Sequence, residues 1–387
     1  MQWINFLHLY QPPGQPRGFI RRVTQESYRW ILQELQRVPN ARMTINLTGS
    51  LTEQLIKFKQ DDILKGFKRL VEREQIELTG TAMYHPILPL LPPEEVLRQI
   101  QLNDALHRTV FGRAWKPKGF YLPEMAYSRS VASLLSTLKV QWIILDEIAF
   151  PDGVPDPNIQ YRIRGLPLQV VFRHRMLSSD YVPRVLLDLL DAPNGLTNLI
   201  TATDGEMYGH HHKDTSRHFE QTLADKRLAL QTISSYLQTR SSQKVVTPRA
   251  SSWVSTTPYL RKNIPYQFWD NPQNPIHQHT WLLTQLAIRA IKHHRKDPGW
   301  ESARHHLDQG LASCTFWWSA GMRPVATSPI TWNPDEVERG INALIRSIRS
   351  FNHLPPAQRL RAEKCYLLIK ELIWKKHWTY YWKYHIH

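Results

Sequence analysis

Seven short apolar runs, each followed by a segment of helix length, recur through the first half of the 387-residue chain. The runs are rich in β-branched and aromatic residues, which strands favour. The segments between them, such as residues 26–38 and 128–140, repeat apolar residues at the three- and four-residue spacing of a helix. This alternation predicts βαβ units around a parallel sheet. The predicted strands are residues 4–10, 43–49, 76–82, 118–124, 141–147, 169–175 and 198–206.

Ionisable side chains follow the carboxyl ends of these predicted strands. In a parallel α/β barrel, and equally in an open doubly wound sheet, the active site is built at that end of the strands. Seven units are enough to close a barrel, so we expect an α/β barrel and keep an open sheet as the alternative. The residues placed at this end are His8, Glu77, Glu124, Asp146, Arg173, Asp204 and Glu206.

The pattern changes after about residue 250. Residues 275–296 and 334–351, among others, read as helices without intervening strands, and residues 251–275 form a segment rich in Trp, Tyr, Pro and Asn. We therefore expect a catalytic barrel over residues 1–250, and over 251–387 an aromatic loop with a helical bundle that packs on the barrel mouth.

The chain carries 49 Lys and Arg against 33 Asp and Glu, a net charge of +16. The basic residues are spread along the sequence and form no helix-turn-helix or zinc-finger pattern, so we expect neither nucleic acid nor a membrane as partner. The basic, aromatic segment 370–387 is expected to pack its Trp and Tyr face on the body of the protein. The apolar runs are too short to span a membrane, no signal peptide is recognisable, and there are two cysteines; a cytoplasmic location fits.

Two segments supply carboxylates with catalytic potential. Glu124 follows Pro123 at the end of one predicted strand, and Asp204, Gly205 and Glu206 follow another. Taken singly, Glu124 fits an ion-pair partner and Asp-Gly a tight turn. Two carboxylates on one barrel face fit the cleavage of a glycosidic bond, and a spacing of about 5–5.5 Å would indicate retention of configuration.

The three histidines at 210–212 raise a metal site as an alternative. Adjacent side chains do not converge on one ion, and the chain has no HExxH motif. His8, Asp204 and His210 nevertheless remain candidates for a deacetylase-like metal site.

Six segments resemble glycoside hydrolase family 57. HLYQPPG (8–14) is similar to the first family motif, with Tyr10 in place of a histidine, and EQIELTG (74–80) to the second. GFYLPEMAYS (119–128) closely resembles the third motif as found in branching-enzyme-like members, and TDGEMYGHH (203–211) resembles the fourth. ASSWVS (250–255) and LDQGLASCTFWWSAGMRP (307–324) resemble segments of the helical region.

The resemblance implies an incomplete (β/α)7 barrel followed by a C-terminal helical bundle. It places Glu124 on the nucleophile and Asp204 on the general acid/base. Tyr10 and His174, which stands where relatives often have an acid, are departures from the family pattern. The residues expected to contact the sugar are His8, Tyr10, Glu77, His85, Glu206, His210, Trp253 and Trp317.

The expected function is therefore a retaining hydrolase or transglycosylase of α-glucans or related α-glycosides, with an oligo- or polysaccharide as substrate and without a cofactor or metal. The metal-dependent carbohydrate deacetylase and a catalytically impaired glycan-binding protein remain as alternatives. The oligomeric state is left open.

Overall fold

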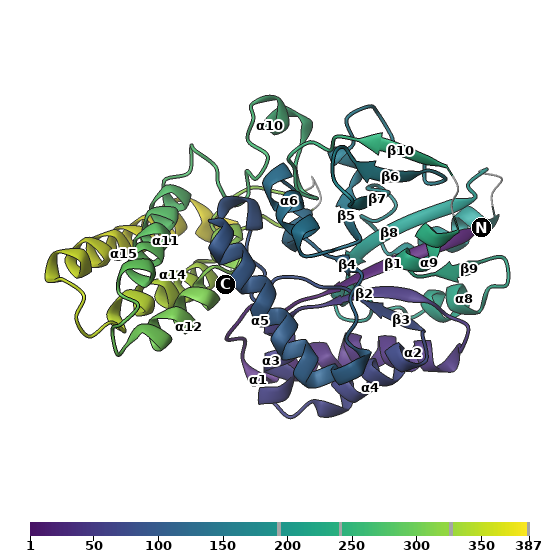
Figure 1. Cartoon of the computed structure of the whole chain (residues 1–387), viewed down its shortest axis with the longest axis horizontal. Coiled ribbons are helices and arrows are strands. Elements are labelled where there is room, and N and C mark those ends of the chain that lie inside the picture. Colours follow the sequence, from purple (N-terminus) through teal and green to yellow (C-terminus); the bar gives the residue numbers. More distant parts are fainter. Residues whose placement is uncertain (192–194, 240–241, 325–327, 385–387) are drawn as a thin grey trace. The chain divides into compact units, whose positions relative to one another are not determined.

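The structure is a computed structural model that describes residues 1–191, 195–239, 242–324 and 328–384 (Figure 1). The chain divides into two compact units. The first consists of Met1–Met83 and Leu88–Trp253, and the second of Tyr84–Ile87 and Val254–His387.

The first unit contains the predicted alternation of strands and helices. All seven predicted strands are confirmed, although most are shorter than expected. After three of them the polar residues at the carboxyl end leave the ladder and enter a short 3-10 turn, at Pro123–Met125, Glu147–Ala149 and Gly205–Met207. They are β1 (Gln2–Leu9), β2 (Met43–Leu47), β3 (Ile76–Leu78), β4 (Gly119–Phe120), β5 (Trp142–Asp146), β7 (Gln169–Arg173) and β8 (Asn198–Asp204).

These seven strands are parallel and follow one another around an incomplete barrel. One sheet has the order β3-β2-β1-β8, and the second contains β7-β5-β4. A parallel bridge between Gly80 and Phe120 joins β3 to β4, so the ladder runs from β8 to β7. Between β7 and β8 the backbone link is a single bond from His174 N–H to Ile200 O, 2.8 Å, where a closed barrel would have a full ladder.

Among the described residues, three further strands lie outside the parallel seven. β6 (Gln160–Ile163) pairs antiparallel with β7, and β10 (Gln243–Val246) extends that edge. β9 (Ala229–Gln231) pairs with the start of β1.

Most helices of the first unit cover the outside of the barrel. Ser128 caps α6 by accepting a hydrogen bond from Val131 N–H. Two aspartates occupy the first turn of α4, where their negative charges interact favourably with the helix dipole. The helices are α1 (Arg17–Val23), α2 (Arg29–Arg37), α3 (Gly49–Lys57), α4 (Asp61–Glu72), α5 (Pro93–Phe111), α6 (Arg129–Thr137), α7 (Val182–Asp191), α8 (His218–Ala224) and α9 (Ile233–Gln238). A π-helical turn, Thr24–Tyr28, joins α1 to α2.

Alternate residues of the strands face the barrel interior. Ile4 and Phe6 of β1 pack there with Tyr121, Ile144 and Ile200 in one buried cluster. The opposite faces of the strands pack against the helices in a second cluster. Apolar side chains therefore make up much of the interior below the layer of His8, which lies next in the same alternation on β1.

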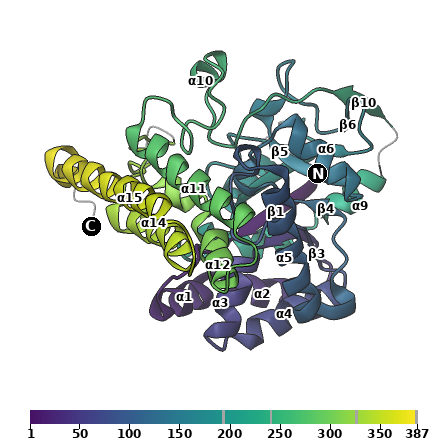
Figure 2. The same ribbon diagram turned by 60° about the vertical axis from the view of Figure 1, so that its left-hand side comes forward.

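The second unit is helical, as predicted. Figure 2 shows α11, α14 and α15 side by side, and the structure gives contacts among all three. Its elements are α10 (Thr257–Arg261), α11 (Pro275–His293), α12 (Trp300–Gly310), α13 (Cys314–Trp317), α14 (Pro334–Arg349) and α15 (Pro356–Lys376), followed by turns at His377–Tyr381 and Trp382–Tyr384.

The expected packing of the C-terminal aromatic face is wrong in part. Tyr381 is buried against Trp332, whereas Trp378 is 63% exposed and Trp382 55% exposed. The chain turns from α-helix to π-helix at His377, which changes the face on which later residues lie. Among the described residues, no helix is both long and apolar enough to span a membrane.

Candidate active site

The carboxyl ends of β1 and β8 bring His8 and Asp204 side by side, since these two residues are partners in the parallel register. The Asp204 side chain is exposed to solvent on one side. On its other sides, protein atoms surround the carboxyl group and desolvate it. This burial raises the pKa of Asp204 to about 6, and the nearby guanidinium of Arg173 opposes the shift. Asp204 can thus hold a proton in mildly acidic solution and release it near neutrality.

The chain turns sharply after Asp204 because Gly205 lies against β1. A Cβ atom on Gly205 would lie 1.9 Å from Leu9 Cδ2, so any larger residue would displace the turn. The carbonyl of Gly205 also accepts a 2.9 Å bond from Ser27 Oγ, which ties the turn to the π-helical segment before α2. This local packing fixes the position of both neighbouring carboxylates.

Glu206 is buried beside Asp204. Its Oε1 accepts hydrogen bonds from the Tyr28 hydroxyl and from Gln11 Nε2, the latter at 3.1 Å. Burial and the negative charge of Asp204 raise the pKa of Glu206 to about 8, although the hydrogen bonds oppose the shift. Glu206 is therefore neutral at pH 7.

Glu124 lies in a strained turn, Pro123–Met125, that follows β4. Its φ is +59° and that of Met125 is +49°, a left-handed conformation uncommon for residues with a side chain. The Glu124 carboxylate accepts a 2.8 Å hydrogen bond at Oε2 from the indole Nε1 of Trp253. This charge-assisted contact favours the ionised carboxylate.

Tyr121 lies within the electrostatic influence of both candidate catalytic carboxylates. Burial raises the pKa of its phenol well above the ordinary value, and the charges of Glu124 and Asp204 raise it further. The negative charges of both carboxylates therefore disfavour ionisation of the same hydroxyl group. The Tyr121 ring contacts His8, with centroids 4.5 Å apart, and meets Trp253 edge to face at 6.3 Å.

His8 is a neutral group in this site. Its Nδ1 lies 2.8 Å from Asn46 Oδ1, and burial lowers the pKa of the imidazole to about 3. Tyr10, which takes the place of the histidine expected from the family, stacks on His8 with centroids 5.9 Å apart. The layer that surrounds Asp204 is thus aromatic and uncharged on the β1 side.

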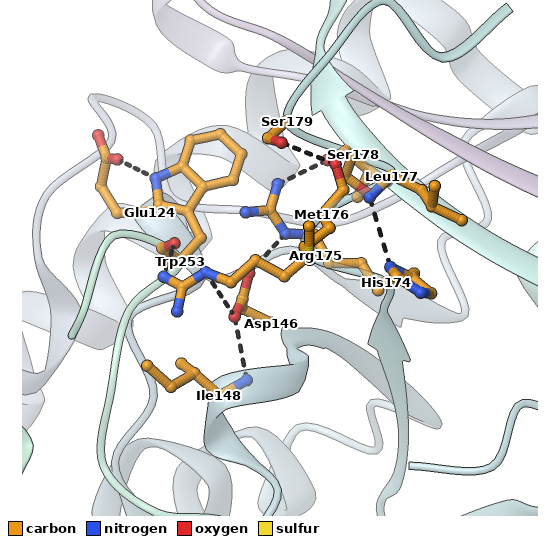
Figure 3. Close-up of polar contacts among 12 residues, drawn as sticks. Glu124, Asp146, Ile148, His174, Arg175, Met176, Leu177, Ser178, Ser179 and Trp253 are labelled. Atoms are coloured by element: carbon orange, nitrogen blue, oxygen red, sulfur yellow. Dashed lines mark hydrogen bonds and ion pairs between the residues drawn. The ribbon is translucent and has the colours of Figure 1, made fainter. Parts of the chain in front are cut away.

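Two arginines contact the buried carboxylate of Asp146, and Figure 3 labels Asp146 and one of them, Arg175. Arg173 Nε donates to Asp146 Oδ2 at 2.8 Å, and Arg173 also donates to the carbonyl of Ala202 at 2.7 Å. Arg175 lies 3.5 Å from the other oxygen of Asp146. His174, which replaces an acid of the family pattern, lies between them in sequence and accepts a 3.4 Å bond from Leu177 N–H.

The structure gathers His8, Tyr10, Glu124, Asp204, Glu206 and Trp253 and does not bring Glu77 to their layer. Glu77 pairs with Thr44, which is level with Phe6, two residues before His8. Its carboxylate accepts bonds from Thr44 and Ser234 and lines a separate cavity of about 640 Å³.

The remaining predicted sugar contacts have other partners. His210 Nδ1 lies 2.5 Å from Glu26 Oε2. His85 belongs to the second unit, where its Nδ1 lies 3.0 Å from Ser313 Oγ. Trp317 of the same unit stacks on Phe268 at 4.9 Å.

Sequence reasoning missed the roles of Tyr28 and Asn46, which hold Glu206 and His8. No motif contains either residue, and only their positions in the fold reveal them. Within the described ranges, no group of three or more His, Cys, Asp and Glu side chains is arranged to hold a metal ion. The metal-site alternative based on His8, Asp204 and His210 therefore gains no support from the geometry.

Solved structures share this architecture. The 4-alpha-glucanotransferase of Thermococcus litoralis superposes with a TM-score of 0.71 at 17% identity, over 91% of this chain and 60% of that one. A branching enzyme of Thermococcus kodakaraensis superposes with a TM-score of 0.67 at 15% identity, over 94% of both chains. The fold is thus the incomplete (β/α)7 barrel with a following helical region that the sequence predicts.

The family model of glycosyl hydrolase family 57 matches residues 8–251, and the chain belongs to this family. An alpha-amylase of Pyrococcus horikoshii is 29% identical over 155 residues, which are 39% of this chain and 24% of that protein. A 4-alpha-glucanotransferase of Thermococcus kodakarensis is 25% identical over 153 residues, or 39% and 23% of the two proteins. These matches span about a quarter of the length of the curated relatives.

Proposed function

We propose that the protein is a retaining glycoside hydrolase or transglycosylase that acts on α-glucans, with Glu124 as nucleophile and Asp204 as general acid/base. The observation that carries the proposal is the contrast between the two carboxylates. Glu124 accepts a charge-assisted bond that favours its ionised form, whereas burial raises the pKa of Asp204 to about 6. Two carboxyl groups with opposed environments supply a base and an acid in one site.

The reaction follows from these two states. Glu124 attacks the anomeric carbon while the bond from that carbon to the glycosidic oxygen breaks, and Asp204 gives its proton to the departing oxygen. The product is a glycosyl ester on Glu124. Asp204 then takes a proton from water or from a sugar hydroxyl, whose oxygen attacks the same carbon and releases Glu124. Two inversions give retention of configuration.

Neighbouring groups fit the handling of a neutral sugar. The pKa of Glu206, about 8, leaves this carboxyl protonated at neutral pH, so it can donate as well as accept hydrogen bonds. His8 is neutral for the same reason, its burial. Relatives named alpha-amylase and 4-alpha-glucanotransferase support an α-glucan as substrate. Cys314 and Cys365 form no disulfide, which supports a cytoplasmic location.

The test uses maltooligosaccharides and amylose, with the anomeric configuration of the first product read by NMR. We expect the α-anomer from the wild-type protein. Glu124→Gln and Asp204→Asn should each lower the rate by several orders of magnitude, whereas the matched change Glu371→Gln on the exposed face of α15 should not alter it. A β-anomer, or unchanged rates in either catalytic variant, would refute the proposal.

A further inference from the structure

Trp253 holds Glu124 at two points (Figure 3). Its indole Nε1 donates to the carboxylate Oε2 at 2.8 Å. Its backbone N–H donates to the carbonyl of Glu124 at 3.1 Å. One residue, 129 positions further along the chain, therefore contacts both the peptide and the side chain of the proposed nucleophile.

The peptide at Glu124 needs such support. Glu124 and Met125 are consecutive non-glycine residues with positive φ, a conformation that persists only where the surroundings enforce it. The backbone bond from Trp253 restrains this turn from outside, while the indole bond sets the plane of the carboxylate. A carboxylate fixed in this way has fewer unproductive orientations toward an anomeric carbon.

Trp253 is itself fixed by a buried set of charges. Arg175 donates to the Trp253 carbonyl at 2.5 Å, and the guanidinium of Arg173 lies over the Trp253 ring at 5.1 Å from its centroid. Both arginines meet Asp146, which is 1% exposed. Because a guanidinium lies over the indole, that face of the ring is not open for stacking on a sugar.

We propose that Trp253 positions the nucleophile Glu124, and that Asp146, through Arg173 and Arg175, holds Trp253 in place. This inference rests on the proposed function of Glu124. Trp253 is a positioning residue in this account, in contrast to the sugar-contacting role that the family resemblance implies for it. The same Arg173 also acts on Asp204, so one buried ion pair supports both catalytic carboxylates.

The first test replaces the indole donor and keeps an aromatic ring. Trp253→Phe should lower kcat by about 10- to 100-fold with little change in KM, because the donor acts on the reacting group and not on the bound sugar. Without the donor, the carboxylate of Glu124 is protonated at higher pH, so the acid limb of kcat/KM should move to higher pH. A merely structural role would leave that limb in place.

The matched control is Trp300→Phe in α12. The Trp300 indole donates to the Ile291 carbonyl at 3.0 Å, so this variant also loses one indole hydrogen bond, but in the helical unit. It should keep the wild-type kcat and acid limb. An increase in KM with unchanged kcat and acid limb in Trp253→Phe would show a sugar-stacking residue and overturn the proposal.

A second pair of variants tests the support of Trp253. Arg175→Met removes the donor to the Trp253 carbonyl, and it should reproduce the lowered kcat and the shifted acid limb in weaker form. Arg175→Lys keeps the charge and should recover part of the loss. Wild-type kcat and acid limb in Arg175→Met would remove Arg175 from the proposal.

A third measurement does not depend on activity. In 15N-tryptophan-labelled protein, the indole N–H resonance that disappears in Trp253→Phe should shift with pH as Glu124 ionises. It should lose this response in Glu124→Gln. An unresponsive resonance in the wild-type protein would overturn the inference, whatever the activity. A responsive resonance in a wild-type protein that cleaves no α-glucan would instead refute the proposed function and support the Trp253–Glu124 contact.

Discussion

The hydroxyl of Tyr28 donates a hydrogen bond to Oε1 of Glu206, and both side chains are buried at the rim of the barrel. Burial raises the pKa of Glu206 to about 8, and the negative charge of Asp204 adds to the shift. Two carboxyl groups separated by one glycine therefore differ in charge at neutral pH. Tyr28 and Gln11 pair the buried Oε1 of Glu206, and their hydrogen bonds partly oppose the rise of its pKa.

Glu206→Gln should stabilise the protein increasingly as the pH rises. The folded pKa of Glu206 lies above its ordinary value of 4.5, so its favourable contribution to folding is present below about pH 4.5 and is lost as the pH rises toward 8. The loss is on the order of a few kcal/mol. Glutamine keeps the acceptor for Tyr28 and does not titrate. Thermal unfolding between pH 5 and 9 should show the Tm difference growing with pH, and a constant difference would contradict the raised pKa.

Asp204 should control the alkaline limb of the reaction. The general acid must be protonated, and burial raises the pKa of Asp204 to about 6, so kcat/KM should fall as the pH rises through about 6. Asp204→Asn should lower the rate on maltooligosaccharides by roughly 10²- to 10⁴-fold. An aryl α-glycoside whose leaving group needs no proton should keep a far faster glycosylation step in this variant. An equal loss on both substrates would argue against an acid role.

Glu77 should prove to be a structural residue. Its carboxylate accepts a 3.0 Å bond from Ser234 N–H and a 3.3 Å bond from Thr44 Oγ1, one layer below His8. Glu77→Ala leaves these buried donors unpaired and should destabilise the fold by about 1–3 kcal/mol. Glu77→Gln keeps an acceptor and should leave KM for maltooligosaccharides unchanged. A higher KM with an unchanged Tm in Glu77→Gln would support the sugar contact that the family resemblance implies.

The strands and the place of Asp204 could be predicted because they depend on local patterns. A buried β-branched run followed by Asp-Gly marks the end of an inner strand, and parallel strands end on one face. Asp204 and His8 accordingly meet as register partners. The depth of Glu77 in the barrel could not be predicted in this way. It depends on how many residues of β3 precede the turn and on the position of Ser234 in α9.

The contact between Trp253 and Glu124 could not be predicted from sequence patterns either. It requires the left-handed turn at Glu124 and a return of the chain 129 residues later, and no local spacing encodes either event. The raised pKa of Glu206 depends in the same way on Tyr28, which comes from a π-helical turn that has no sequence signature. Sequence motifs therefore identify the candidate acidic residues, whereas tertiary packing determines their pKa values.

The turn that carries both Asp204 and Glu206 depends on the absence of a side chain at Gly205. A Cβ atom there would lie 1.9 Å from Leu9 Cδ2, and the Leu9 side chain is packed between the outer face of β1 and the helices. Gly205→Ala must therefore push the turn away from β1 or force Leu9 from its position in the core, at a cost of about 1–3 kcal/mol. Displacement of the turn moves Asp204, so we expect kcat to fall by at least tenfold in a protein that still folds.

Gly18→Ala is the matched control for this change. Gly18 lies in α1, and a Cβ atom there would have no heavy atom within 4 Å. Alanine in a helix is favoured over glycine, so this variant should be as stable as the wild type or slightly more stable, with unchanged kcat. Comparison of the two variants by thermal unfolding and by initial rates on maltooligosaccharides separates the close approach at Leu9 from the general effect of adding a methyl group. Equal behaviour of the two variants would show that the turn after β8 tolerates a side chain, and that Asp204 is held by other contacts.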